Sequence, residues 1–211
     1  MSIHNPLLEA RLEAIRMSLD DLAAIIDDGM KMLVDRIAFN LSFTEKVKPI
    51  AEAAKAARER CLLLVARQAP LARDLKYAMG ALRIAHDYER MHELVSALNV
   101  RFHRLEGQPV QTISKEMGVV LTSLMDLHHV VKKTWQRERD EISLPNIKPE
   151  VEKMYSGVEA GIMVIQSETI GAIAKGFSNP EVAVELVLAT RHVERIATLL
   201  EDIPSELHSF D

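Results

Sequence analysis

Residues 70–102 read PLARDLKYAMGALRIAHDYERMHELVSALNVRF, and this stretch decides the fold. Apolar side chains recur along it every three or four positions, the spacing that lines one face of a helix. These side chains are Ile84, Tyr88, Met91, Val95, Leu98 and Phe102. A shorter apolar set lies on nearly the opposite face and consists of Leu75, Ala78, Met79 and Leu82. Because Glu89 and Glu93 continue this second face, we predict a central helix whose carboxylates face a neighbouring helix.

The composition indicates a chain that folds around an apolar core. Of the 211 residues, 48% are hydrophobic and 27% are charged, so the sequence is not typical of a disordered tail. The net charge of −5 and the pI near 5.9 argue against a nucleic-acid-binding protein, which would show a basic stripe. Aromatic residues make up 4%, too few for a platform on which bases stack.

The single cysteine, Cys61, lies in the apolar run CLLLVA. It has no partner for an intramolecular disulfide, which fits a reducing compartment, and we read it as a packing residue rather than a nucleophile. Residues 1–13 lack the apolar segment of a secretory signal, and no apolar run approaches the ~20 residues of a membrane span. We therefore expect a cytoplasmic protein that does not insert into a membrane.

The apolar periodicity predicts an all-α fold of six helices. No stretch shows sustained alternation of apolar and polar residues, so we predict no strands. The expected helices span residues 6–40, 46–68, 71–105, 111–141, 149–175 and 180–203. Pro204 is expected to follow the last helix, and Gly107 and Gly176 stand where C-terminal caps do. Long helices joined by short links predict an antiparallel bundle.

The two halves of the chain repeat each other at an offset of 105 residues. The stripe of the first helix, from Leu8 to Met30, falls on apolar residues from Ile113 to Trp135 at every position, and the same offset maps Glu89-Arg90-Met91 onto Glu194-Arg195-Ile196. We therefore predict two tandem three-helix antiparallel bundles related by a pseudo-twofold internal repeat, over residues 1–106 and 107–211.

Carboxylates at helical spacing are the first candidates for chemistry. Glu89 and Glu93 are four residues apart and share one face of a helix. Their equivalents in the second half are Glu194 and Thr198, with Glu201 one turn further on. Hard cations bind where several such oxygens converge. The alternative is a set of solvated or ion-paired carboxylates, which are common on helices.

Histidines give a weaker signal. Glu89 and His92 show the Glu-x-x-His spacing of di-iron carboxylate bundles, but the second half has no histidine at the matching place, which argues against a di-iron oxidase. We read His128 and His129 as an exposed or core-edge pair. No nucleotide-binding, nucleophile-elbow or zinc-protease motif occurs.

The sequence resembles the PhoU family, the accessory regulators of bacterial phosphate uptake. Residues 70–75 (PLARDL) and 81–90 (ALRIAHDYER) resemble its hallmark segment, and residues 191–196 (RHVERI) resemble the second copy. The similarity extends over nearly the whole chain through its length and its two three-helix units.

This resemblance implies a cytoplasmic regulator of high-affinity phosphate uptake and phosphate-starvation signalling that is not an enzyme. It also implies that the protein contacts the ATPase subunit of the phosphate transporter and a sensor histidine kinase, and that it assembles as a homodimer. We expect no nucleic-acid partner.

The resemblance further implies metal candidates, namely Glu89, Glu93, Asp87, Glu194 and Glu201. The family motif is Glu-x-x-x-Asp; Glu93 keeps the charge of its last position, whereas Thr198 removes it in the second half. We therefore expect iron, zinc, manganese or magnesium to bind weakly or not at all.

Arg73, Arg83 and Arg90 lie along the central helix with Arg101 and Arg104, and we assign the first three to partner binding. A solvated face with local ion pairs is the alternative for these arginines. For the whole protein, the alternatives are a metal-dependent helical-bundle enzyme that uses Glu89, His92 and Glu93, and a structural scaffold.

Overall fold

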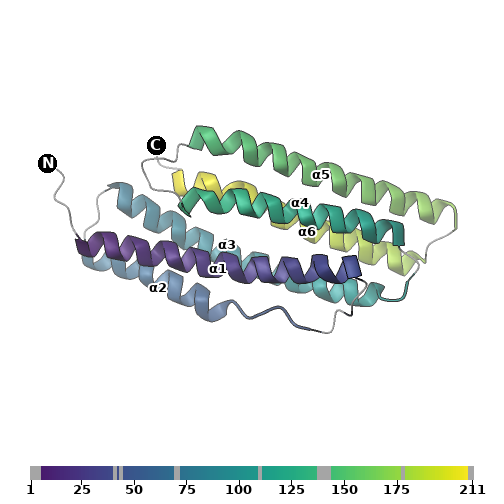
Figure 1. Cartoon of the computed structure of the whole chain (residues 1–211), viewed down its shortest axis with the longest axis horizontal. Coiled ribbons are helices and arrows are strands. Elements are labelled where there is room, and N and C mark those ends of the chain that lie inside the picture. Colours follow the sequence, from purple (N-terminus) through teal and green to yellow (C-terminus); the bar gives the residue numbers. More distant parts are fainter. Residues whose placement is uncertain are drawn as a thin grey trace.

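The structure, a computed structural model, describes residues 6–39, 42, 45–68, 72–108, 111–136, 144–176 and 179–208. Its described residues form helices and their connections without strands, which confirms the all-α class (Figure 1). The helices are α1 (Pro6–Phe39), α2 (Ala51–Gln68), α3 (Ala72–Leu105), α4 (Gln111–Gln136), α5 (Leu144–Ala174) and α6 (Pro180–His208).

The six helices run along one long axis and pack as two sets of three (Figure 1). In the first set α1, α2 and α3 all contact one another, and in the second α4, α5 and α6 do the same. The sets meet where α1 packs on α4 and α3 packs on α6, while α2 and α5 lie on the outside. The domain boundary at residues 106–107 and the internal repeat stay predictions.

The stripe that predicted the central helix is buried along its whole length, from Ile84 to Phe102. α3 contacts α1, α2 and α6, which confirms its central position. The second apolar face is less protected, because Leu75 and Met79 each keep 37% of their surface exposed. A single continuous cluster of buried apolar residues draws members from all six helices, so the core passes without a break from one half to the other.

The start of α2 differs from the prediction, which placed it at residue 46. Residues 46–50 have no helical structure, and the helix begins at Ala51. Pro49 disfavours helical backbone at Lys48, the residue before it. The extended segment is held on α3, because the Asn99 side chain donates to the carbonyl of Glu45 at 2.9 Å and Ile50 is buried in the core.

Two prolines lie inside helices instead of bounding them. α5 begins at residue 144 rather than 149, so Pro149 falls in its second turn. α6 continues to residue 208, so the expectation that Pro204 follows the helix is wrong. A proline removes one backbone hydrogen bond, but Leu207 is buried beyond the expected end of the helix and Ile203 is buried at that end, and their burial offsets the loss. The expected last turn of α4, residues 137–141, lies outside the described residues.

Glycines mark the ends and the closest approach of helices. Gly107 and Gly176 have φ of 73° and 71°, the left-handed conformation of a C-terminal cap, as predicted. Gly80 lets α3 approach α6, because a Cβ atom there would lie 2.6 Å from the carbonyl oxygen of Glu206.

Cys61 is buried, and burial raises the pKa of its thiol to about 12, in agreement with a packing role. Within the described ranges, no helix has the length and apolar character needed to cross a bilayer.

Candidate functional site

The structure separates the predicted carboxylate pair of α3. Glu89 is half-buried and forms an ion pair with Arg58 of α2, so it faces a neighbouring helix as expected. Glu93, one turn later, is exposed. Because Arg58 balances the charge of Glu89, the ion pair joins α2 to α3 and has a structural role.

His92 is also committed to a structural contact. Its Nε2 lies 2.8 Å from the carbonyl oxygen of Lys48, so this nitrogen donates to the segment that precedes α2. The three residues named for a metal-dependent enzyme therefore point to three different surroundings: Glu89 to Arg58, His92 to Lys48, and Glu93 to solvent.

Asp87 lies in a different environment, at the contact between α3 and α6. It is buried, its Oδ1 is 3.6 Å from Arg90 Nη1, and its carboxyl group is hydrogen-bonded to that of Glu206 on α6. Two carboxyl groups in contact hold a proton between them, because both cannot ionise at close range without large repulsion.

The electrostatics of this acid pair follow from its burial. Burial and the charge of Asp87 raise the pKa of Glu206 to about 7, and burial also raises the pKa of Asp87. Arg90 and His86 favour ionisation of Asp87. Near neutral pH, therefore, Glu206 holds the proton and donates it to the Asp87 carboxylate.

The second half has its own group of acids between α5 and α6. Glu201 is half-buried near Glu159 and Glu152 of α5, and burial together with the charges of Asp202, Glu159 and Glu152 raises its pKa. Glu194, seven residues before Glu201 on α6, is exposed.

Thr198 takes the place where an acid was expected in the second half. Its hydroxyl donates to the carbonyl oxygen of Glu194 at 3.1 Å and is hydrogen-bonded to Tyr155 of α5. Thr198 therefore joins α6 to α5 through a hydrogen bond and does not supply the negative charge of an acid.

These positions do not fit a metal site. In the described part of the chain, no three Asp, Glu, His or Cys side chains lie close enough to hold a metal ion. Asp87 shares a proton with Glu206, and Glu89 is paired with an arginine, so neither offers a free charged oxygen. The metal assignment remains a prediction without geometric support.

The arginines of α3 divide into two groups. Arg101 and Arg104 both bind Glu185 of α6, at 2.8 and 2.9 Å, so they join the two halves of the chain as ion pairs. Arg73, Arg83 and Arg90, the candidates for partner binding, lie exposed on the surface of α3.

A buried network of hydrogen bonds that was not predicted lies where α1, α3 and α4 meet. His128 of α4 has its Nε2 at 2.7 Å from the Tyr88 hydroxyl and its Nδ1 at 2.7 Å from Asp27 Oδ1. Lys132, one turn after His128, forms an ion pair with Asp27 Oδ2. The expectation of an exposed or core-edge histidine pair is wrong for His128, which is fully buried, whereas His129 keeps 51% of its side chain exposed.

The protonation states of this chain of hydrogen bonds can be assigned. Burial raises the pKa of Asp27, but hydrogen bonds from His128 and Lys132 and the charge of Lys132 outweigh burial and lower this pKa to about 2, so Asp27 is ionised. Burial lowers the pKa of His128, so its ring is neutral near pH 7. His128 therefore donates from Nδ1 to Asp27 and accepts at Nε2 from the Tyr88 hydroxyl.

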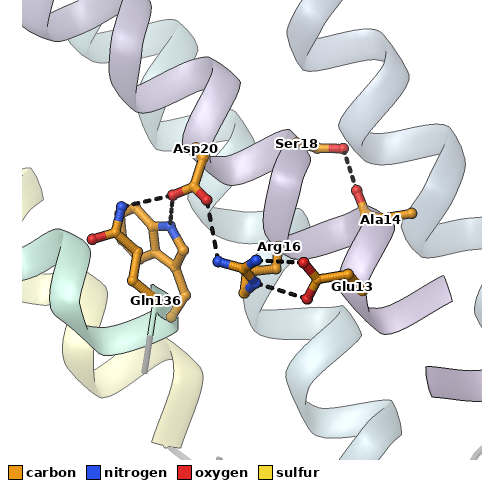
Figure 2. Close-up of polar contacts among 7 residues, drawn as sticks. Glu13, Ala14, Arg16, Ser18, Asp20 and Gln136 are labelled. Atoms are coloured by element: carbon orange, nitrogen blue, oxygen red, sulfur yellow. Dashed lines mark hydrogen bonds and ion pairs between the residues drawn. The ribbon is translucent and has the colours of Figure 1, made fainter. Parts of the chain in front are cut away.

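A second junction of α1 and α4 lies near the end of α4. Asp20 accepts hydrogen bonds from the Trp135 indole at 3.0 Å and from the Gln136 amide at 2.8 Å, and Arg16 lies on its other side (Figure 2). The Trp135 ring meets Tyr88 edge to face, with centroids 6.1 Å apart. The two junctions are thus parts of one polar and aromatic contact between the halves.

This constellation resembles a proton relay in composition, but its position determines what it does. Tyr88 and His128 have no exposed surface, so no substrate reaches them in this conformation. Buried polar groups with every partner satisfied specify one relative placement of the elements that carry them. We infer that the Asp27–His128–Tyr88 chain fixes how the first and second halves dock.

Sequence reasoning misread His128 and missed its partners Asp27 and Lys132, and it also missed Glu206. His128 pairs with residues 40 and 101 positions away in the chain, and no local spacing signals such a contact. Glu206 lies in the part of α6 beyond Pro204 that was expected to be outside the helix. A continued apolar spacing, Leu200, Ile203 and Leu207, was the available signal for the longer helix.

Comparison of the chain with models of known protein families gives no match. Comparison with curated proteins gives none either.

Replacing His128 tests the docking role of the buried chain. His128→Leu leaves the Tyr88 hydroxyl without its buried partner and removes one of the hydrogen bonds to Asp27, so we expect the free energy of unfolding to fall by about 2–4 kcal/mol. His129→Leu is the matched control: it removes only the exposed contact with the same Asp27, at 3.6 Å, and should lower the free energy of unfolding by less than about 1 kcal/mol. Chemical denaturation of both variants measures the difference, and equal effects would contradict the role given to His128.

The acid pair predicts a pH dependence of stability. Because the folded chain holds the Glu206 proton up to about pH 7 while the unfolded chain releases it near 4.5, stability falls as pH rises through this window. Glu206→Gln removes the penalty, so we expect it to raise the free energy of unfolding by roughly 1–2 kcal/mol at pH 8 and to leave it nearly unchanged at pH 4.5. Glu194→Gln, an exposed change on the same helix, is the control. A stabilisation by Glu206→Gln that is equal at both pH values would show that the pair does not share a proton.

Proposed function

We propose that this chain is a cytoplasmic regulator of high-affinity phosphate uptake and phosphate-starvation signalling. In this role it binds the ATPase subunit of the phosphate transporter and the cytoplasmic part of a sensor histidine kinase, and it acts without catalysing a reaction. We further propose that it assembles as a homodimer and that any bound iron, zinc, manganese or magnesium is held weakly.

One observation carries the proposal. The two segments that resemble the repeated PhoU motif lie on α3 and α6, the helices that pack against each other across the two halves. In the first segment, Asp87 stands at this contact through its hydrogen bond to Glu206, and the second segment supplies the buried Val193 and Ile196 of α6. Because the two copies of the motif lie on helices that pack against each other, one contact between the halves explains why both copies are present.

The surface of α3 supports binding of an acidic partner. Arg73, Arg83 and Arg90 are exposed along one helix, spaced over some 17 residues or ~25 Å. Charged side chains on a rigid helix steer a partner of opposite charge and set its orientation.

A deletion strain tests this function. We expect cells without the protein to accumulate phosphate and to express phosphate-starvation genes in phosphate-rich medium, and expression of the wild-type chain should restore repression. The double variant Arg73→Glu, Arg83→Glu should fail to restore it, because both partner-facing charges are reversed. Lys55→Glu, Arg67→Glu, two exposed positions of α2, is the control with the same change of charge and should restore repression.

Two results would contradict the proposal. A deletion strain with normal phosphate content and normal gene expression would favour a scaffold without a role in phosphate uptake. Purified protein that carries stoichiometric iron or manganese and turns over a phosphate ester would favour the enzyme.

A further inference from the structure

The outer helix α5 and its neighbour α6 share a surface that no other helix of the described chain covers. α5 contacts α4 and α6 and no part of the first half. A hydrogen bond from Gln166 of α5 to Thr190 of α6, 3.2 Å long, fixes the antiparallel register of the two helices. Residues on the same face of α5 as Gln166, at helical spacing, therefore line the boundary with α6.

This boundary is apolar at one end. On α5, Met163, Ile170 and Ile173 lie three, four and seven positions from Gln166 and are 65%, 64% and 43% exposed. On α6, Val187 lies three residues before Thr190 and is 37% exposed, and Val184 one turn earlier is 56% exposed. Scattered exposed aliphatic residues are ordinary, but five gathered along one boundary indicate a surface that binds a partner.

The other end of the same boundary is acidic. Glu159 lies seven residues before Gln166 on the same face, and Glu152 lies two turns before it. Glu201 of α6 faces both, and burial together with their charges raises its pKa, so their negative charges are close to one another and incompletely balanced. Lys148 is the cation on this side, 3.7 Å from Glu152.

Basic residues are scarce along this surface. From residue 154 to the end of α5 at Ala174, the only charged side chains are Glu159 and Glu168. On α6, Arg191 lies seven residues after Val184 and therefore on the same stripe, between the aliphatic end and the acidic end, and Glu194 follows three residues later. The boundary is therefore negative at one end and uncharged at the other, with Arg191 and Glu194 as one charge of each sign between them.

We propose that the α5–α6 surface, formed by Glu152, Glu159, Met163, Ile170, Ile173, Val187 and Glu201, binds a cationic amphipathic helix of another protein. Lysines or arginines at one end of that helix pair with the three glutamates, and its aliphatic residues cover the apolar end. From Glu152 to Ile173 the surface is ~32 Å long, which matches a helix of about 20 residues. The inference rests on the proposed role as an interaction protein, but not on any role of phosphate.

Charge complementarity favours this occupant over two others. A second copy placed antiparallel would set its glutamates on the aliphatic end of the first, and a parallel copy would set glutamates against glutamates; both arrangements bury unpaired charge. An anionic membrane would be repelled by the acidic end. A helix with one basic end and one aliphatic end meets both parts of the surface favourably.

Binding of a designed peptide to the full chain tests the proposal. The probe is a fluorescent 20-residue amphipathic helix with lysines in one half and leucines in the other, and the control peptide has glutamates in place of the lysines. Fluorescence anisotropy should show binding of the first peptide and at least tenfold weaker binding of the second.

Four variants with matched charge changes decide whether the surface is the right one. Ile170→Lys should weaken peptide binding at least tenfold, whereas Leu62→Lys, at a position of similar exposure (57%) on α2, should change it less than twofold. Glu159→Lys should likewise weaken it at least tenfold, whereas Glu168→Lys, on the same helix but off the face of Gln166, should not. All positions are exposed or half-buried, and circular dichroism confirms that each variant is folded.

Three results would overturn the proposal. Equal effects of all four variants would mean that net charge alone attracts the peptide. Self-association of the wild-type chain in sedimentation velocity, or its cosedimentation with phosphatidylglycerol vesicles, would assign the surface to a second copy or to a membrane if Ile170→Lys abolished it. None of these measurements depends on phosphate. A failed peptide assay beside a clear phosphate phenotype would therefore remove this surface and leave the proposed function standing.

Discussion

The structure depends on a short chain of buried hydrogen bonds in which Tyr88 donates to His128 and His128 donates to Asp27. Tyr88 on α3 and Asp27 on α1 belong to the first half of the chain, and His128 on α4, which lies between them, belongs to the second half. Apolar packing alone tolerates sliding of one helix along another, whereas these three groups satisfy each other in one placement only. The aromatic contact of Trp135 with Tyr88 and the bond of Trp135 to Asp20 extend the same junction.

A fixed junction has consequences for the outer surfaces. Among the described helices, α2 and α5 contact only those of their own half, so their outer faces lie on opposite sides of the central helices. The exposed arginines of α3 and the α5–α6 surface differ in charge, and they lie on helices whose relative placement the core determines. A rigid bundle with these two surfaces can hold an acidic partner and a basic partner at a fixed distance from each other. The proposed regulator between a transporter and a sensor would need this property.

Much of this fold could be predicted from the sequence, because helical periodicity is a local property. The spacing from Ile84 to Phe102 indicated a buried central helix, and glycines 107 and 176 marked helix ends correctly. Proline was a less reliable guide, because burial of Ile203 and Leu207 against neighbouring helices carries α6 through Pro204. A tertiary contact can outweigh a local signal, and the sequence does not show that contact.

The candidate site could be predicted less well. Carboxylates at helical spacing were found, but their function depends on what faces them: Arg58 neutralises Glu89, and Glu206 shares the proton of Asp87. The burial of His128 depends on partners 40 and 101 residues away, beyond the reach of any local pattern.

The central claim is that the junction makes both halves one cooperative unit. The chain has one tryptophan, Trp135, and it lies at the junction itself, so its fluorescence reports on docking, while far-ultraviolet circular dichroism reports on helix content. Urea unfolding followed by both signals should give coincident transitions with the same midpoint and slope. A fluorescence transition at lower urea, with the helix content retained, would show that the halves separate before they unfold and would contradict the account.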